Sequence, residues 1–354
     1  MDEKQIVNPH ANFFQKVFSR LDVAHDFISY YLPKKIVKQL DLTTLEIDRE
    51  TFIDILLSAT QSDLVLKVNR KDGKKLLIYI LIEHKSFLDK WVLFQVLGYT
   101  VRISEREREI KALERKKQRQ NNIKNGLPEN HGIEKECINV VVPVIFYHGK
   151  KKWTIKKLST LYCKANQFIS YIPEFKYELI DLSTYDDNQI IGNLYLKVAM
   201  LVMKYFYHDA FDDLFTSFLA LLHDVIHEWP TLDFIATVSM YSSSHKSRGS
   251  KWLSSTIENK YIKAFGEKGG EVMQTVSNIW IEQGKKEGKK EGKKEGIKEA
   301  IIEALRIKYM TISQSLFTFI QSIKDENTLH NLHREVIVCN DMAEFQKRLD
   351  KIAV

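Results

Sequence analysis

Cysteine is scarce in this sequence, and the three cysteines present are far apart. They are Cys137, Cys163 and Cys339 in a chain of 354 residues. An odd number of widely spaced cysteines, with no CxxC pair, excludes a disulfide framework and a paired-cysteine zinc site as the basis of the fold. We therefore expect a protein of a reducing compartment, the cytoplasm.

Long hydrophobic runs are also missing. The purest apolar segment, residues 76–82, is far shorter than the roughly 20 apolar residues that cross a bilayer. The first residues, MDEKQIVNPHANFF, are polar and mixed in charge, which is unlike a secretory signal. We expect no membrane association. A glycine-rich phosphate loop and a Ser-His-Asp pattern are likewise not found in the sequence.

The overall composition is that of an ordinary globular protein. Apolar residues make up 44% and charged residues 28% of the chain. The formal net charge is +7 and the isoelectric point is near 9.0. Such a balance permits a polyanionic partner such as DNA but does not require one.

Four regions follow one another along the chain. Residues 1–185 mix helical and strand patterns, residues 190–265 are helical in pattern, residues 280–300 hold a GKKE repeat, and residues 301–354 are helical again. In the first region, 63–68 and 76–85 are predicted strands separated by the turn sequence RKDG. A long helix over 90–117 and strands over 138–147 and 177–182 complete an α/β pattern with a mixed sheet flanked by helices.

The GKKE repeat is a low-complexity segment that forms either a helix or a flexible linker. Each glycine costs a helix about 1 kcal/mol relative to alanine. The i,i+4 pairs join identical residues, and only i,i+3 pairs such as Glu287 with Lys290 are favourable. We slightly favour a helix that acts as a solvated spacer. With the basic runs 106–119 and 150–152, it could also contact phosphates without reading sequence.

Chemistry is concentrated at the end of the second predicted strand. Glu83 and Lys85 are two residues apart, so both side chains project from one face. Charged residues that finish a nearly all-apolar strand are costly unless they are paired, metal-bound or at the exposed end.

The hairpin connection decides where Asp63 points. A two-residue turn would place Asp63 opposite Ile82, on the wrong face. A three-residue loop over 71–73 with a bulge at its glycine sets Asp63 opposite Leu81 and diagonal to Glu83, at roughly 7–8 Å. We therefore predict the bulged turn, which brings both carboxylates to one point.

Two carboxylates and a lysine in this arrangement suit phosphodiester hydrolysis. Asp63 and Glu83 could hold Mg²⁺, which keeps waters for substrate and nucleophile. Lys85 would orient the attacking water and stabilise the developing negative charge. By pattern alone, a solvated ion pair at a strand end and an aspartate in a loop explain the same residues.

Asp63 followed by Glu83-His84-Lys85 resembles the signature of the PD-(D/E)XK nuclease superfamily. The wider context resembles the Rpn family of recombination-promoting nucleases, which are also described as transposases. The segments that carry this resemblance are NPHANFFQKVFS, SYYLP, DLTTLEI, SDLVLKV, YILIEHKS, VPVIFYHGKKKWT, ELIDLS and LHREVIVCNDMAEFQKRL.

The resemblance implies a restriction-endonuclease-like core and a magnesium-dependent DNA endonuclease that promotes recombination or transposition. Asp63, Glu83 and Lys85 match the catalytic positions, the main-chain carbonyl of His84 would be an additional metal ligand, and Mn²⁺ could replace Mg²⁺. Relatives usually read His-Asp where this chain has His10-Ala11. Two rival functions follow: a catalytically decayed DNA-binding or transposition accessory protein, and a helical interaction protein.

Other candidate residues carry weaker signals. His223 and His227 have a metal-binding spacing on a predicted helix but no third ligand, so a surface pair is favoured. A substrate-side role for His148 or Trp153 is weighed against loop packing, which is favoured. Gln95, on the helix after the core motif, could approach the site, although exposure is the expected state of such a residue.

Overall fold

The computed structural model describes residues 8–48, 64–72, 77–133, 137–163, 167–245, 248, 252, 256–310, 312–323 and 325–352. Contacts divide these residues into two compact units, one up to Met273 and one from Gln274 onward. The first unit contains a sheet with its covering helices, and the second is helical.

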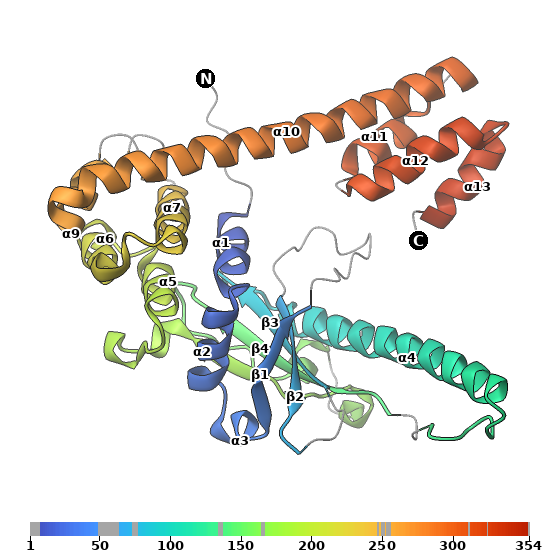
Figure 1. Cartoon of the computed structure of the whole chain (residues 1–354), viewed down its shortest axis with the longest axis horizontal. Helices are drawn as coiled ribbons and strands as arrows, with labels where there is room; N and C mark the ends of the chain where they lie inside the picture. The colour runs from blue at the N-terminus through green and yellow to red at the C-terminus, as the bar shows by residue number, and fades with distance from the viewer. Residues whose placement is uncertain are drawn as a thin grey trace. The chain divides into compact units, whose positions relative to one another are not determined.

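A mixed sheet forms the centre of the first unit (Figure 1). Its described strands are β1 (Leu40–Ile47), β2 (Leu64–Arg70), β3 (Leu77–Lys85), β4 (Val140–Tyr147) and β5 (Glu178–Asp181). They lie in the order β1-β2-β3-β4-β5, with β1, β2 and β3 antiparallel to one another and β4 and β5 continuing parallel to β3. The predicted α/β class with a mixed sheet flanked by helices is confirmed.

Strand β1 was not among the predicted strands, and its pairing explains why. Leu40 pairs with Arg70 whereas Glu46 pairs with Lys67, so the register shifts between the two ends of β1. Leu40 and Leu45 are both buried although they are five residues apart. An irregularity of this kind interrupts the period-two alternation by which strands are found in a sequence.

Helices α1 (Pro9–Phe18) and α2 (Leu21–Tyr31) cover one face of the sheet. Phe13, Phe14, Val17 and Phe18 are buried on α1, at the spacing of one helical face. Phe14 and Phe18 stack on each other and contact Phe146 of β4, with ring centroids 5.3 Å apart in both cases. An aromatic core therefore lies beneath these two helices.

Helix α4 (Val92–Lys124) covers the other face and contacts β3 and β4. Its buried apolar residues Val92, Val96, Tyr99 and Ile103 recur every three or four positions. The buried Glu107 follows one turn later, and its Oε2 accepts the Asn139 backbone N–H at 2.7 Å. Beyond that point the helix is largely exposed and extends past the sheet (Figure 1). It ends seven residues later than predicted, and much of its basic part lies in this exposed end.

The predicted helical region after the sheet belongs to the same compact unit. Its helices are α5 (Leu194–Tyr205), α6 (Phe211–Ala220), α7 (Trp229–Ser243) and α9 (Ile257–Phe265). Helix α1 contacts α5 and α7. Shorter elements are α3 (Lys34–Val37) and the 3₁₀ turns Leu158–Leu161, Ile169–Tyr171, Leu182–Thr184, Asp187–Gln189, His223–Val225 and Gly266–Lys268.

The GKKE repeat is helical and lies within α10 (Gly269–Tyr309). The end of α10 packs with α11 (Gln314–Ser322), α12 (Glu326–Val338) and α13 (Met342–Ile352) around a small core that includes Leu305, Ile320, Leu332 and Phe345. The Lys298 ammonium donates to Glu295 at 2.9 Å and to the Gln321 carbonyl at 3.0 Å, which ties α10 to the end of α11. The helical C-terminal region is confirmed.

Length does not make either long helix a membrane segment. Helices α4 and α10 have 33 and 41 residues but carry charged side chains along most of their length. Among the helices that the structure describes, none is long and apolar enough to span a membrane.

Replacing Gly288 and Gly292 by alanine is expected to stabilise α10 by about 1 kcal/mol per site, because alanine is the better helix former. A Cβ at either position meets no atom within 4 Å. The measurement is amide hydrogen exchange along α10. As a contrast, Gly269→Ala should destabilise the protein, since its Cβ would lie 2.5 Å from the Ile262 Cα. Unchanged protection in the Gly288→Ala/Gly292→Ala variant would contradict the helical assignment of the repeat.

Candidate functional site

Glu83 and Lys85 form a buried ion pair at the end of β3. The Lys85 Nζ lies 2.8 Å from the Glu83 Oε1. Their exposed fractions are 0% for Glu83 and 7% for Lys85. The two side chains share one face of the strand as predicted, but they are not the solvated pair that the sequence pattern also allowed. Burial of two charges is costly and requires close pairing.

The Glu83 carboxylate is only partly satisfied by its neighbours. Apart from the ion pair, neither of its oxygens accepts a hydrogen bond of acceptable geometry from the residues that the structure describes. A buried carboxylate with free acceptor capacity suits a hard divalent cation. Asp63, the predicted second ligand, lies outside the described residues. Among the described residues alone, no group of three His, Cys, Asp or Glu side chains could hold a metal ion.

Two further side chains hold the Lys85 ammonium in place. The Gln95 Oε1 of α4 accepts a hydrogen bond from the Lys85 Nζ at 2.6 Å, and the Asp89 Oδ2 lies 3.2 Å from the same nitrogen. Asp89 also accepts the Trp91 backbone N–H at 2.9 Å, so it fixes the turn that leads into α4. The approach of Gln95 was considered from the sequence. Asp89 was missed, and its position four residues after Lys85 and just ahead of a helix was the available signal.

The pKa of Lys85 shows which role this side chain can take. Burial by itself lowers the pKa, but the adjacent carboxylates of Glu83 and Asp89 outweigh it and raise the pKa above 10.5. Lys85 is therefore an ammonium at neutral pH. It can donate hydrogen bonds and stabilise negative charge, but it cannot act as a general base.

The pairing of β2 with β3 corrects the predicted register. Leu81 faces Val65 rather than Asp63, and Leu64 faces Ile82. The bulged turn predicted over 71–73 requires Arg70 opposite Lys74 and does not fit this register, in which the last described pair is Asn69 with Leu77. Residues 73–76 of the connection lie outside the described residues. The difference is two residues, so each residue keeps the face that was predicted for it.

His84 points to the opposite face from Glu83 and Lys85. Its ring stacks between Phe14 of α1, at a centroid distance of 4.8 Å, and His148, at 4.9 Å. Burial, together with the nearby His148, His10 and Lys85, lowers the pKa of His84 well below 6.5. The imidazole is therefore neutral and part of the core. Its main-chain carbonyl remains a predicted metal ligand.

His148 belongs to the same buried cluster and not to the substrate side. Its Nδ1 lies 3.2 Å from the Met203 carbonyl, and the side chain is 3% exposed. Next to it, the His10 ring nitrogens lie 2.7 Å from the Tyr241 hydroxyl and 2.8 Å from the Tyr207 hydroxyl. Burial lowers the pKa of His10 to about 4, with a contribution from His245. Burial and His10 lower the pKa of His148 to about 3.

The remaining candidates from the sequence, His223, His227 and Trp153, lie on the surface or pack under a loop. His223 and His227 are both exposed, and His223 contacts Asp224 at 3.2 Å, as expected of a surface pair. Trp153 is 7% exposed, and its indole N–H donates to the Ile155 carbonyl at 2.7 Å. It therefore packs under a loop, at the floor of a pocket described below.

Breaking the buried ion pair from one side is expected to be more harmful than removing it. Lys85→Met leaves the Glu83 carboxylate buried without its cation, which should cost about 3–5 kcal/mol of unfolding free energy. The Glu83→Gln/Lys85→Met double variant leaves no unpaired carboxylate and should be more stable than Lys85→Met. Urea unfolding with EDTA present measures the wild type, Glu83→Gln, Lys85→Met and the double variant.

Lys16→Met serves as the control, because Lys16 pairs with Asp233 on the surface, at 3.4 Å with both side chains well exposed. It should change the unfolding free energy by less than about 1 kcal/mol. If the losses of unfolding free energy in the two single variants simply add in the double variant, the buried pair is contradicted.

The neutral histidines predict a loss of stability in acid. Their folded pKa values, about 4 for His10 and about 3 for His148, lie below the ordinary 6.5. Between pH 6.5 and about 4 the unfolded chain binds protons that the folded chain does not. Stability is therefore complete above pH 6.5 and falls as the pH drops, by about 1.4 kcal/mol per pH unit for each histidine.

Urea midpoints measured against pH test this prediction. His148→Leu should make the fall in unfolding free energy with falling pH shallower, because one histidine no longer contributes its share of about 1.4 kcal/mol per pH unit. The exposed control His223→Leu should keep the pH dependence of the wild type. Equal slopes in wild type and His148→Leu would show that His148 is not held neutral.

Comparison with known proteins shows which family the sequence is similar to. The chain is 27% identical over 206 residues to "Recombination-promoting nuclease RpnA" of Escherichia coli (strain K12), which covers 58% of this chain and 62% of that protein. It is 25% identical over 205 residues to "Recombination-promoting nuclease RpnD" of Escherichia coli O157:H7, with 56% and 67% covered. The chain thus spans less than two thirds of the length of RpnA.

A third relative carries a different description. "Inactive recombination-promoting nuclease-like protein RpnE" of Escherichia coli (strain K12) is 26% identical over 202 residues, with 57% of this chain and 52% of that protein covered. No solved structure matches the chain. The family model described as "Putative transposase, YhgA-like" matches residues 8–230, which include the whole described sheet and the Glu83–Lys85 pair. Because this match covers more than half of the sequence, the chain belongs to the YhgA-like transposase family.

Proposed function

We propose that this protein is a divalent-metal-dependent DNA endonuclease that promotes recombination or transposition. Its family and the names of RpnA and RpnD support a nuclease. The observation that carries the proposal is the buried Glu83 carboxylate, unsatisfied except by the Lys85 ammonium at 2.8 Å. A carboxylate and an ammonium held together at a strand end, with capacity left for a cation, suit hydrolysis of a phosphodiester.

Asp63 is the second metal ligand in this proposal. The described pairing of β2 with β3 ends at Leu64 opposite Ile82. Asp63 lies outside the described residues, and the proposal places it opposite Glu83, where it would lie if this register continued by one residue. Directly opposed residues of an antiparallel pair lie roughly 4.5–5.5 Å apart at the Cα atoms. The two carboxylates and the main-chain carbonyl of His84 would hold Mg²⁺, and Mn²⁺ could serve in its place.

The bound metal would supply an acidified water and neutralise charge on the phosphate. Lys85 donates a hydrogen bond that orients the attacking water and remains positively charged beside the phosphate as negative charge develops. Gln95 and Asp89 fix the position of its ammonium from the start of α4. This pre-orientation avoids reorganisation of the lysine during the reaction.

A catalytically decayed protein is the second candidate function. It is suggested by the similarity to RpnE, described as inactive, and by Ala11 in place of the aspartate that relatives usually have. Helix α1, which carries Ala11, packs against β3 on the face of His84, opposite to Glu83. This placement favours an intact site, because residue 11 and Glu83 lie on opposite faces of the sheet.

Nicking of supercoiled plasmid with Mg²⁺ or Mn²⁺ tests the proposal. Wild type should convert the plasmid to open circles, and EDTA should abolish the reaction. Asp63→Ala, Glu83→Gln and Lys85→Ala should each reduce the rate by at least about a hundredfold, since each removes a ligand or a charge-stabilising group.

Asp72→Asn, an acidic residue paired with Arg70 in the same hairpin, is the matched control and should retain wild-type nicking. DNA binding without nicking by the wild type would identify the decayed accessory protein. Neither binding nor nicking would support an interaction protein.

A further inference from the structure

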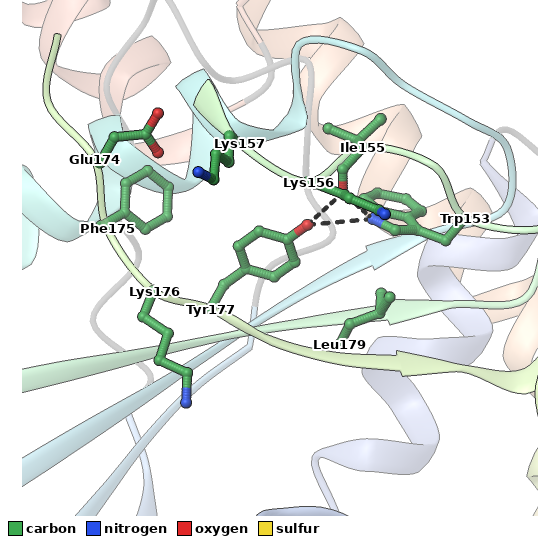
Figure 2. A pocket seen from close by; sticks show the side chains of 9 residues that line it. All are labelled: Trp153, Ile155, Lys156, Lys157, Glu174, Phe175, Lys176, Tyr177 and Leu179. Atoms are coloured by element: carbon green, nitrogen blue, oxygen red, sulfur yellow. Dashed lines mark hydrogen bonds between the residues drawn. The ribbon is translucent and has the colours of Figure 1, made fainter. Parts of the chain in front are cut away.

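A pocket lies beside β5, at one edge of the described sheet (Figure 2). Its volume is about 620 Å³. Three aromatic side chains and three lysines dominate its lining, which consists of Trp153, Ile155, Lys156, Lys157, Glu174, Phe175, Lys176, Tyr177 and Leu179. Aromatic rings combined with cations are suited to a ligand that has both a planar ring and negative charge.

One wall of the pocket lies on the same face of the sheet as the Glu83–Lys85 pair. Glu83 pairs with Ile145 of β4, and Ile145 pairs with Leu179 of β5. Residues in register across neighbouring strands share a face, so Leu179 in the pocket wall lies on the face of Glu83. Glu83 and Leu179 are separated by two strand spacings, which is about 10 Å. That distance corresponds to about three stacked nucleotides at about 3.4 Å each.

The aromatic floor of the pocket is fixed by hydrogen bonds. The Ile155 carbonyl accepts both the Trp153 indole N–H, at 2.7 Å, and the Tyr177 hydroxyl (Figure 2). The indole N–H also lies 3.3 Å from the Tyr177 oxygen. Phe175 also lines the pocket and is half-buried. The rings of Trp153 and Tyr177, which form this floor, are therefore oriented before any ligand arrives. A preformed floor lowers the entropic cost of binding.

The charge available to a ligand in this pocket is positive. Lys156 and Lys157 are exposed, and within the described part of the chain neither lies within ion-pair distance of a carboxylate, although the charge of Lys157 contributes to lowering the pKa of Glu174. The Glu174 carboxylate accepts the Ser159 backbone N–H at 2.9 Å, and this bonding to Ser159 lowers the pKa of Glu174. Lys176 is paired with Glu178 at 3.0 Å. Two lysines thus remain to contact a phosphate.

We propose that this pocket binds an unpaired nucleotide of single-stranded DNA close to the scissile phosphate. The base stacks on Phe175, and Lys156 and Lys157 contact the adjoining phosphates. The inference builds on the proposed nuclease function, because it assigns the strand that enters the site of Glu83. Single strands are bound in this manner by proteins that combine stacking surfaces with cationic grooves.

Binding can be measured apart from cleavage. The probe is a fluorescein-labelled 15-residue oligothymidylate, followed by anisotropy in EDTA with the Glu83→Gln variant as background. Lys156→Ala/Lys157→Ala should weaken binding about tenfold or more and lower the salt slope by about 0.7 for each lysine. The matched control is Lys151→Ala/Lys152→Ala, which removes the same charge from neighbouring exposed lysines outside the pocket and should weaken binding less than about threefold.

The contribution of the base is tested with a second variant and a second probe. Phe175→Ala should weaken binding of the oligothymidylate about tenfold, and it should not affect a 15-residue abasic strand. Equal losses in the two lysine double variants would overturn the proposal, because only net charge would then matter. A Phe175→Ala loss that is the same on both probes would also overturn it, as would tighter binding of a duplex than of the single strand.

The two proposals can fail independently. Pocket-dependent binding of the oligothymidylate by a wild type that never nicks plasmid would retain the pocket and refute the nuclease. Nicking that depends on Glu83 and Lys85, with Lys156→Ala/Lys157→Ala indistinguishable from its control, would refute the pocket and retain the nuclease.

Discussion

The buried ion pair between Glu83 and Lys85 is the interaction on which the site depends. Two charges at the end of an apolar strand are tolerated only if each finds partners in a fixed geometry. The strand β3 is central in the sheet, with β2 and β4 on either side, so its backbone cannot shift to relieve the pair. Helix α4 supplies Gln95 to the lysine. The packing of α4 on the sheet therefore sets the position of the ammonium.

The two faces of β3 have opposite chemical roles. One carries the ion pair beneath α4, and the other carries His84 within an aromatic and histidine cluster beneath α1. Strand alternation makes this separation possible, since neighbouring residues point to opposite faces. Because burial keeps the pKa of His84 and His148 low, the cluster adds no positive charge behind the carboxylate. The position of Glu83 is thus supported by neutral packing.

Periodicity was sufficient to predict the sheet class, the shared face of Glu83 and Lys85, and the extent of most strands. It could not predict the register of β2 against β3, because a shift by two residues leaves every side chain on the same face. The observed pairing of Val65 with Leu81 satisfies the apolar pattern as well as the predicted one did. Strand β1 escaped prediction because the shift in its register breaks the alternation.

Long-range contacts account for what else the sequence could not show. Asp89 lies in the turn before α4, and its approach to Lys85 follows only when β3 and α4 pack together. The pocket of Trp153 and Tyr177 is assembled from a loop and from the start of β5, which are more than twenty residues apart. Burial of Glu83 and Lys85 was likewise undetermined, because the same motif fits a solvated strand end.

Titration of the purified protein with Mn²⁺, followed by the electron paramagnetic resonance signal of the free ion, tests the central claim most directly. The account predicts binding that Glu83→Gln and Asp63→Asn each weaken at least about tenfold, since each removes one charged ligand. Asp72→Asn should bind Mn²⁺ as wild type does. Binding that is indifferent to Glu83→Gln would contradict a metal site at the end of β3.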